Sequence, residues 1–297
     1  MAQGIANRPQ STGLHMPRPY ARSAGQSMFP GLWRGLKLGG MPGQNIGTGS
    51  NLGHTPAIFD IVMGKPAVVP AVPQIDGEVG PYGGVASMSS SEASSNDNFL
   101  MGWFTATDVP FSDHFSVMFF GSYDGGNGAD YTCVLAKGGV FSNDSQFALG
   151  FRNGTPSTPF FYARNVATLL GAEGGTYTVG DDVVMIGTWD STNTSQVTYL
   201  DGVSVLTSSS GAPTDGTDRF TLGGADNSGT DKTLLGKMYV YAYWDRVLSA
   251  GEVQILSLNP FALFQPKSIS LGFVAAGAPA AVARRRVGMA MSGAMRI

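Results

Sequence analysis

The chain has 297 residues, 42 of them glycine, and only 13% of its residues are charged. Its few glutamates and its many Ser, Thr, Asn and Asp residues suit short strands joined by turns better than helices. A single cysteine, Cys133 in an apolar run, excludes an internal disulfide framework. No apolar stretch reaches the roughly 18 residues that a membrane-spanning helix needs, and no secretory signal opens the chain.

The charged residues are unevenly distributed. Five basic residues and no acid precede Asp60, and five basic residues and no acid follow Glu252, so each end carries +5. The other 8 basic residues and all 21 acids leave the middle at −13, and 10 − 13 gives the net charge of −3. These ends lack the dense basic runs with interleaved aromatics that bind single-stranded nucleic acid, so we expect them to bind acidic protein surfaces. The candidate assembly residues are Arg8, Arg18, Arg22, Arg34, Lys37, Lys267, Arg284, Arg285, Arg286 and Arg296.

Residues 1–29 are predicted to form an extended basic arm, because they contain several prolines and no periodicity. Residues 30–60 hold scattered apolar anchors such as Trp33, Leu36 and Leu38 among glycines. The prolines of residues 57–75 allow only short or edge strands.

Regular alternation begins near residue 80, and turn signals at regular spacing indicate a sandwich or barrel. Asp201-Gly202, between two alternating apolar runs, is the strongest hairpin signal. The predicted strands are Gly84–Met88, Phe99–Thr105, His114–Gly121, Tyr131–Ala136, Gln146–Arg152, Pro159–Asn165, Gly175–Val179, Val183–Asp190, Gln196–Leu200, Val203–Ser208, Asp218–Leu222 and Lys237–Asp245.

The last predicted strand carries an unusual row of tyrosines. Strict alternation places Met238, Val240, Ala242 and Trp244 on one face and three tyrosines on the other. The row is either a second buried face or a platform for stacking on a glycan. The candidate stacking residues are Tyr123, Tyr239, Tyr241 and Tyr243.

A short helix is predicted after this strand. Ser249 and Glu252 form a capping-box pattern, and Asn259-Pro260 ends the helix. Residues 267–297 are rich in Ala, Gly and Arg and are predicted to form a second basic arm, in which Ala280–Ile297 becomes helical on binding.

Two segments resemble a known family. Val184-Met-Ile-Gly-Thr-Trp-Asp190 followed by Val197-Thr-Tyr-Leu-Asp-Gly-Val203 resembles the central hairpin of laminin-G-like jelly-roll domains. Gly236–Glu252 is similar to the closing strand and the helix start of that family. The resemblance implies an all-β, two-sheet antiparallel sandwich of the laminin-G/concanavalin-like kind over residues 30–266, with the best match over 80–266.

The ending Ile255–Pro266 resembles the phage-encoded branch of this family in particular. The resemblance implies a virion structural protein of a tailed phage, made in the host cytoplasm. We expect it to decorate or cement the capsid surface through its arms and to be a homo-oligomer that contacts the major capsid or tail protein. The alternative is a module of a tail or tail fibre that binds a cell-surface glycan. Membrane and nucleic-acid partners are not expected.

The chain shows no catalytic motif. Its four glutamates are isolated, whereas glycoside hydrolases need paired carboxylates. His114, at a strand start, is expected to have a turn or surface role, and no nucleophile elbow or zinc-ligand cluster occurs. We therefore predict a protein that is not an enzyme and needs no cofactor.

Calcium is the one metal that the resemblance suggests, because laminin-G-like domains often hold Ca²⁺ at a sheet rim. Asp124 and Asp130 in one loop are candidates, as are Asp218, Asp226 and Asp231 in another, although aspartate in loops more often serves turn geometry.

Overall fold

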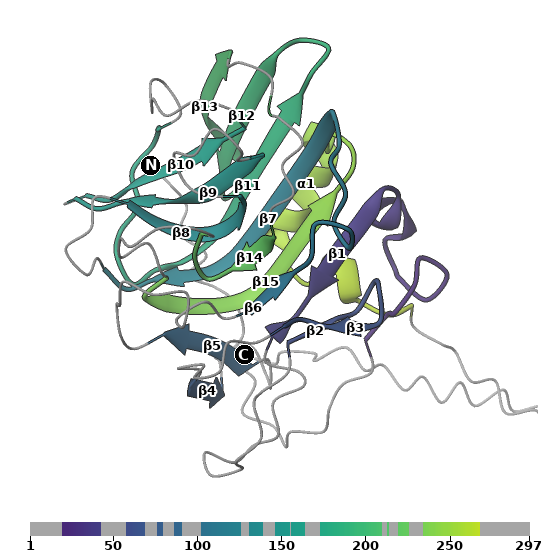
Figure 1. Ribbon diagram of the computed structural model, residues 1–297. Helices are drawn as coiled ribbons and strands as arrows, with labels where there is room; N and C mark the ends of the chain where they lie inside the picture. Colours follow the sequence, from purple (N-terminus) through teal and green to yellow (C-terminus); the bar gives the residue numbers. More distant parts are fainter. Residues whose placement is uncertain are drawn as a thin grey trace, which may run out of the picture.

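The computed structural model describes residues 20–42, 58–68, 76–79, 86–90, 102–125, 131–138, 146–154, 156–163, 173–209, 213, 219–225 and 234–267. Two antiparallel sheets face each other, and one helix lies behind the larger sheet (Figure 1). This arrangement confirms the predicted all-β sandwich with one short helix near the C-terminal end of the described chain.

The larger sheet has eight strands in the order β13-β12-β11-β7-β15-β5-β4, and β1 pairs with β15 beside β5. These strands are β1 (Leu36–Gly40), β4 (Asp76–Val79), β5 (Ala86–Ser90), β7 (His114–Tyr123), β11 (Asp182–Asp190), β12 (Ser195–Leu200), β13 (Val203–Ser209) and β15 (Gly236–Trp244).

The smaller sheet has five strands in the order β10-β9-β8-β14-β6, and β2 and β3 form a separate pair. The strands are β6 (Gly102–Phe104), β8 (Tyr131–Lys137), β9 (Phe147–Arg152), β10 (Thr158–Tyr162), β14 (Phe220–Leu222), β2 (Phe59–Asp60) and β3 (Lys65–Pro66). Of the predicted strands, Gly175–Val179 is wrong: Tyr177 makes only an isolated bridge to Ser157.

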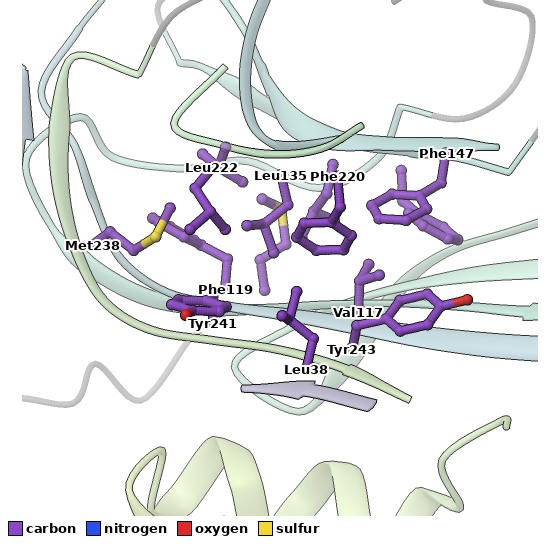
Figure 2. Close-up of a cluster of buried hydrophobic side chains, with 14 of the residues drawn as sticks. Leu38, Val117, Phe119, Leu135, Phe147, Phe220, Leu222, Met238, Tyr241 and Tyr243 are labelled. Carbon is purple, nitrogen blue, oxygen red and sulfur yellow. The ribbon is translucent and has the colours of Figure 1, made fainter. Parts of the chain in front are cut away.

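The main core lies between the two sheets. Figure 2 shows Leu135, Phe147, Phe220 and Leu222 of the smaller sheet pointing toward aromatic and aliphatic side chains of the larger one. Tyr243 belongs to this layer and stacks on Phe115 with ring centroids 6.0 Å apart. Such aromatic pairs add to the free energy gained by burying their apolar area.

The other face of the larger sheet is also covered. The helix α1 (Ala250–Leu258) buries Val253 and Leu256 there. The short 3-10 helices η1 (Pro30–Trp33) and η4 (Ala262–Phe264) pack beside it. A complete capping box confirms the predicted helix start: the Ser249 side chain accepts from the Glu252 N–H, and the Glu252 carboxylate accepts from the Ser249 N–H.

The predicted alternation along β15 is wrong at its beginning. A β-bulge between Met238 and Val240 shifts the register against β7. Met238 therefore points into the inter-sheet core with Tyr241 and Tyr243, whereas Tyr239 joins Val240 on the helix side. The tyrosine row is split between two cores.

The predicted hairpin at Asp201-Gly202 is confirmed. Both residues have positive φ, 49° and 84°, and they connect β12 to β13. Two consecutive residues of positive φ are typical of the tight turn that matches the twist of paired strands. Asp201 also accepts a hydrogen bond from the Val184 N–H through Oδ1 at 3.0 Å, which joins the turn to β11.

The absence of a side chain at Gly187 of β11 makes room for a ring of β10. A Cβ added to Gly187 would lie 2.3 Å from Cδ2 of the buried Phe161 ring. Gly187→Ala should therefore lower the free energy of unfolding by about 1–3 kcal/mol, because the core must shift to admit one methyl group. Urea denaturation measures this, with Gly31→Ala as the control, since a Cβ there would meet nothing within 4 Å. Equal losses in both variants would contradict the close approach.

A buried carboxylate fixes β1 beside the β2–β3 pair. Asp60 accepts hydrogen bonds from the Gly39 N–H at 2.6 Å and from the Met63 N–H. Burial raises the pKa of Asp60 from 3.8 to about 6, against the opposing effect of these N–H donors. The folded chain therefore keeps a proton that the unfolded chain releases between about pH 4 and pH 6.

Stability should accordingly fall as the pH rises through that window, by at most ~3 kcal/mol from this group. An asparagine at position 60 cannot titrate. The unfolding free energy of Asp60→Asn, measured by urea titration at several pH values, should therefore not show this decrease with pH, whatever the absolute stability of the variant. Asp108→Asn is the control. Hydrogen bonds from Lys65 and Thr105 lower the pKa of Asp108, so this substitution should remove a contribution to stability that increases with pH. Parallel curves for the Asp60 variant and the unchanged chain would refute the prediction.

Candidate functional site

The structure contradicts the predicted glycan-stacking residues. Tyr123, Tyr239, Tyr241 and Tyr243 are all buried, with at most 1% of their surface exposed. Their rings lie in the two cores on either side of β7 and β15, so no ring face of these tyrosines is open to a sugar. Trp103 is half-buried on β6, and the Arg219 guanidinium lies 4.5 Å from the centre of its ring.

The predicted calcium ligands Asp218, Asp226 and Asp231 lie outside the described residues, as does Asp130. Asp124 is described, and its Oδ1 accepts a hydrogen bond from Ser122 Oγ at 3.0 Å. Within the described residues no group of three or more His, Cys, Asp and Glu side chains could hold a metal ion. Calcium binding stays a prediction.

A polar and aromatic cluster lies on the outer face of the smaller sheet. Glu173 Oε1 accepts hydrogen bonds from Tyr131 at 3.0 Å and from Tyr162 at 3.3 Å. Its Oε2 accepts from Arg152 Nη1 at 2.9 Å. The Arg152 guanidinium also lies 5.6 Å from the centre of the Tyr131 ring. We call these four residues the Glu173 cluster.

Sheet register brings the Glu173 cluster together. Tyr131 of β8 is directly opposite Arg152 of β9, and Glu173 forms a bridge to Phe160 of β10. The Phe160 ring packs against both tyrosines, with centroids 5.7 Å from Tyr131 and 4.8 Å from Tyr162. The cluster therefore rests on a small apolar layer that includes the buried Cys133.

The chemistry of the Glu173 cluster favours ligand binding over nucleophilic catalysis. Burial, followed by the negative charge of Glu173, raises the pKa of Tyr162, so its phenol stays protonated. The Glu173 carboxylate already accepts three hydrogen bonds. The Arg152 side chain is 51% exposed and can donate to an anionic or hydroxylated ligand.

A second polar group closes the β11–β12 turn. His114 Nδ1 lies 3.1 Å from Asp190 Oδ1, and His114 Nε2 lies 3.3 Å from Ser191 Oγ. This combination of residue types is also that of a nucleophilic triad. However, Asp190 also accepts from the Thr192 N–H and from Asn193 Nδ2, so its hydrogen bonds hold the turn. Burial opposes the ionisation of Asp190, but the bonds from Asn193 and Thr192 and the nearby His114 lower its pKa.

Sequence reasoning missed both groups. Glu173 was expected to be isolated, yet it joins two tyrosines and an arginine that lie 11 to 42 residues away. His114 was expected to have a turn or surface role, which agrees with its contacts, but its partner turn lies 77 residues later in the chain and was not predicted. No spacing motif could have revealed contacts that depend on the register of three strands.

The described end of the predicted N-terminal arm is part of the body. Ala21 and Ser27 are buried, and residues 26–28 run antiparallel to residues 265–267. Three backbone hydrogen bonds of 2.8 Å join the two stretches: Ala21 N–H to Phe264 O, Met28 N–H to Gln265 O, and Lys267 N–H to Gln26 O. Residues 20–29 are thus not an extended arm, because the C-terminal stretch supplies their hydrogen-bond partners.

The predicted assembly residues fall into three groups. Lys37 lies on β1, where it pairs with Asp245 at 2.9 Å, and Arg34 lies just before it, so both belong to the body. Arg22 and Lys267 are exposed where the chain leaves the body. Arg8, Arg18, Arg284, Arg285, Arg286 and Arg296 lie outside the described residues.

No helix in the described part of the chain is long and apolar enough to cross a membrane. A family model, Laminin_G_3, described as the concanavalin A-like lectin/glucanases superfamily, matches residues 95–254, which is 160 of 297 residues. No curated protein matches the chain.

Two similar solved structures are complexes of Trypanosoma rangeli sialidase. The complex with sialic acid is 13% identical, with a TM-score of 0.51 over 76% of this chain and 33% of the sialidase chain. The complex with the inhibitor DANA is also 13% identical, with a TM-score of 0.51 over 75% and 32%. The chain spans about a third of the length of these sialidases. At this identity the likeness shows a shared fold.

Proposed function

This chain belongs to the Laminin_G_3 family of concanavalin A-like lectin-fold domains, and on that premise we propose that it is a non-enzymatic virion structural protein of a tailed phage. In this proposal it decorates or cements the capsid surface. The observation that carries the proposal is the position at which the chain enters and leaves the folded body.

Both ends of the described chain leave the body at one edge. The antiparallel pairing of residues 26–28 with residues 265–267 places the start and the end of the body side by side. The described body therefore begins and ends at neighbouring points. We call this place the exit edge.

The charges on the two sides of the exit edge are opposite. Residues 1–19 carry two arginines and residues 268–297 carry four, with no acid in either, which gives +6. The other 12 basic residues and all 21 acids lie in residues 20–267, which gives −9. Two basic segments that start from one edge can bind an acidic neighbour together, while the acidic body faces away from it.

The chemistry of the polar clusters supports a binding role over a catalytic one. The raised pKa of Tyr162 keeps its phenol from acting as a nucleophile at neutral pH. The His114, Asp190 and Ser191 side chains are engaged in closing a turn. The resemblance of the segment Ile255–Pro266 to phage-encoded domains supports the virion setting.

Antibody raised against residues 80–266 should label the heads of intact virions of the phage that encodes this chain, as seen by electron microscopy.

Deletion of residues 1–19 and 268–297 should reduce co-sedimentation of the purified chain with particles at least tenfold, and salt should weaken the binding of the full chain. Replacing Arg284, Arg285 and Arg286 with alanine should weaken binding, whereas lysine at the same positions should preserve it. Unlabelled heads, or binding that survives deletion of both segments, would overturn the proposal.

A second candidate function is glycan binding by a tail or tail fibre, and the Glu173 cluster favours it. Arg152 presents an exposed guanidinium beside the Tyr131 ring. A sialidase that shares this fold over a third of its own length was solved with sialic acid. The corresponding ligand of this chain would be an acidic sugar held by Arg152.

In this case the purified chain should bind acidic glycans on an array. Arg152→Ala should abolish the signal, and Arg152→Lys should retain part of it, because lysine keeps the charge but not the planar donor pair. Arg22→Ala, which removes an exposed arginine at the exit edge, is the matched control and should bind normally. An array without signal would refute this second function and leave the first untouched.

A further inference from the structure

Residues 58–68 link a strand of the larger sheet to an outer strand of the smaller one. They contain β2 and β3, which form a pair of their own beside β1 (Figure 1). On one side the Ile61 N–H donates to Gly39 O of β1 at 2.9 Å. On the other side Val68 and Trp103 of β6 exchange two backbone hydrogen bonds of 2.9 Å. We call residues 58–68 the strap.

The apolar anchors of the strap that the structure describes are divided between the two cores. Ile58 and Ala67 lie in the core between the sheets, whereas Ile61 lies in the core on the helix side. Residues 64–66, at the tip of the strap, are exposed. A short segment that is anchored by few apolar side chains can open while the rest of a protein stays folded.

A carboxylate is buried where the strap meets β1. Asp60 is fully buried, and its two oxygens accept hydrogen bonds from the N–H groups of Gly39 and Met63. Lys65, the one cation of the strap, pairs with Asp108 at 2.6 Å. In the described part of the chain Asp60 itself forms no ion pair. Its charge is therefore balanced by amide dipoles alone, which leaves part of the cost of burying it.

A second polar group is buried near Asp60. The hydroxyl of Tyr241 on β15 is fully buried and has no hydrogen-bond partner among the residues that the structure describes. It lies against β1, because a Cβ added to Gly40 would be 2.5 Å from the hydroxyl oxygen. Burial, and then the charge of Asp60, raise the pKa of Tyr241. A buried hydroxyl without a partner costs free energy that contact with water would recover.

We propose that the strap is a pH-dependent latch, which lifts from the two sheets without unfolding them when Asp60 ionises. Lifting brings water to the Asp60 carboxylate and to the Tyr241 hydroxyl, so both groups gain hydrogen bonds. The buried side chains of Ile58, Ile61 and Ala67 oppose the lifting. The inference does not depend on the proposed virion role.

The groups around Asp60 set the direction of the pH effect. Tyr241 acts on Asp60 from β15, Asp108 from the turn after β6, and Lys65 from the strap itself. Burial, against the opposing N–H donors and with a smaller contribution from Asp108, raises the pKa of Asp60 from 3.8 to about 6. The closed strap therefore keeps a proton that the lifted strap releases above about pH 4. Acid closes the latch, and neutral pH opens it.

Native-state hydrogen exchange of the full chain, followed by mass spectrometry, tests the latch. After correction for the intrinsic pH dependence of exchange, the protection of residues 58–68 should fall by up to about 100-fold between about pH 4 and pH 7. Exchange in the strap should depend weakly on urea, because lifting exposes little surface. Exchange in β7 should depend on urea as strongly as global unfolding does.

Two substitutions separate the contributions of the two buried groups. Asp60→Asn should remove the decrease in protection with pH, whatever the absolute protection of the variant. Tyr241→Phe should raise the protection of the strap at least fivefold and keep its pH dependence, because phenylalanine needs no hydrogen-bond partner. Tyr123→Phe is the matched control: the Tyr123 hydroxyl donates to Asn153, so its loss should not raise the protection of the strap.

Two results would rule out the latch. Equal protection and equal urea dependence in the strap and in β7 would mean that the strap opens only when the whole sandwich unfolds. A pH dependence that persists in Asp60→Asn would mean that another group controls the opening.

Discussion

The whole structure depends on strand β7, which is paired along both edges and covered on both faces. It lies between β11 and β15, and Phe119 is opposite Met185 on one side and Tyr241 on the other. Phe115, Val117 and Phe119 point toward the smaller sheet, whereas Met118 and Phe120 point toward α1 and its neighbours. Because each large apolar side chain that is fully buried contributes roughly 1.5–3 kcal/mol, this one strand anchors both cores. The family model, which covers residues 95–254, spans all three of these strands.

The sequence predicted those parts of the fold that depend on neighbouring residues. The Asp201-Gly202 turn and the Ser249–Glu252 capping box are local, and both are present. The bulge at Met238–Val240 could not be predicted, because it depends on how β15 meets β7 more than a hundred residues earlier. Strand β1 was also missed: it has only five residues, two of them glycine, and its partner is β15 near the other end of the body.

The functional residues divide in the same way. The basic composition of the segments beyond the body could be recognised in the sequence alone, but Lys37 was wrongly grouped with them because its pairing with Asp245 is a long-range contact. The tyrosine row was predicted as one face of β15, but the bulge splits it between two cores. Of the two interpretations of the row, burial is confirmed and the stacking platform is wrong. Glu173, Arg152 and Tyr131 are assembled by the registers of β8, β9 and β10, so a single sequence contains no sign of their proximity.

The exit edge also has a mechanical consequence. A force applied to the chain beyond residues 20 and 267 would load the hydrogen bonds between residues 26–28 and residues 265–267 one after another, from one end of the pairing. The tension would be absorbed at this edge before it reached the strands of either sheet. A body attached through both of its ends could thus yield by a few residues and close again, while the sandwich itself remained unstrained.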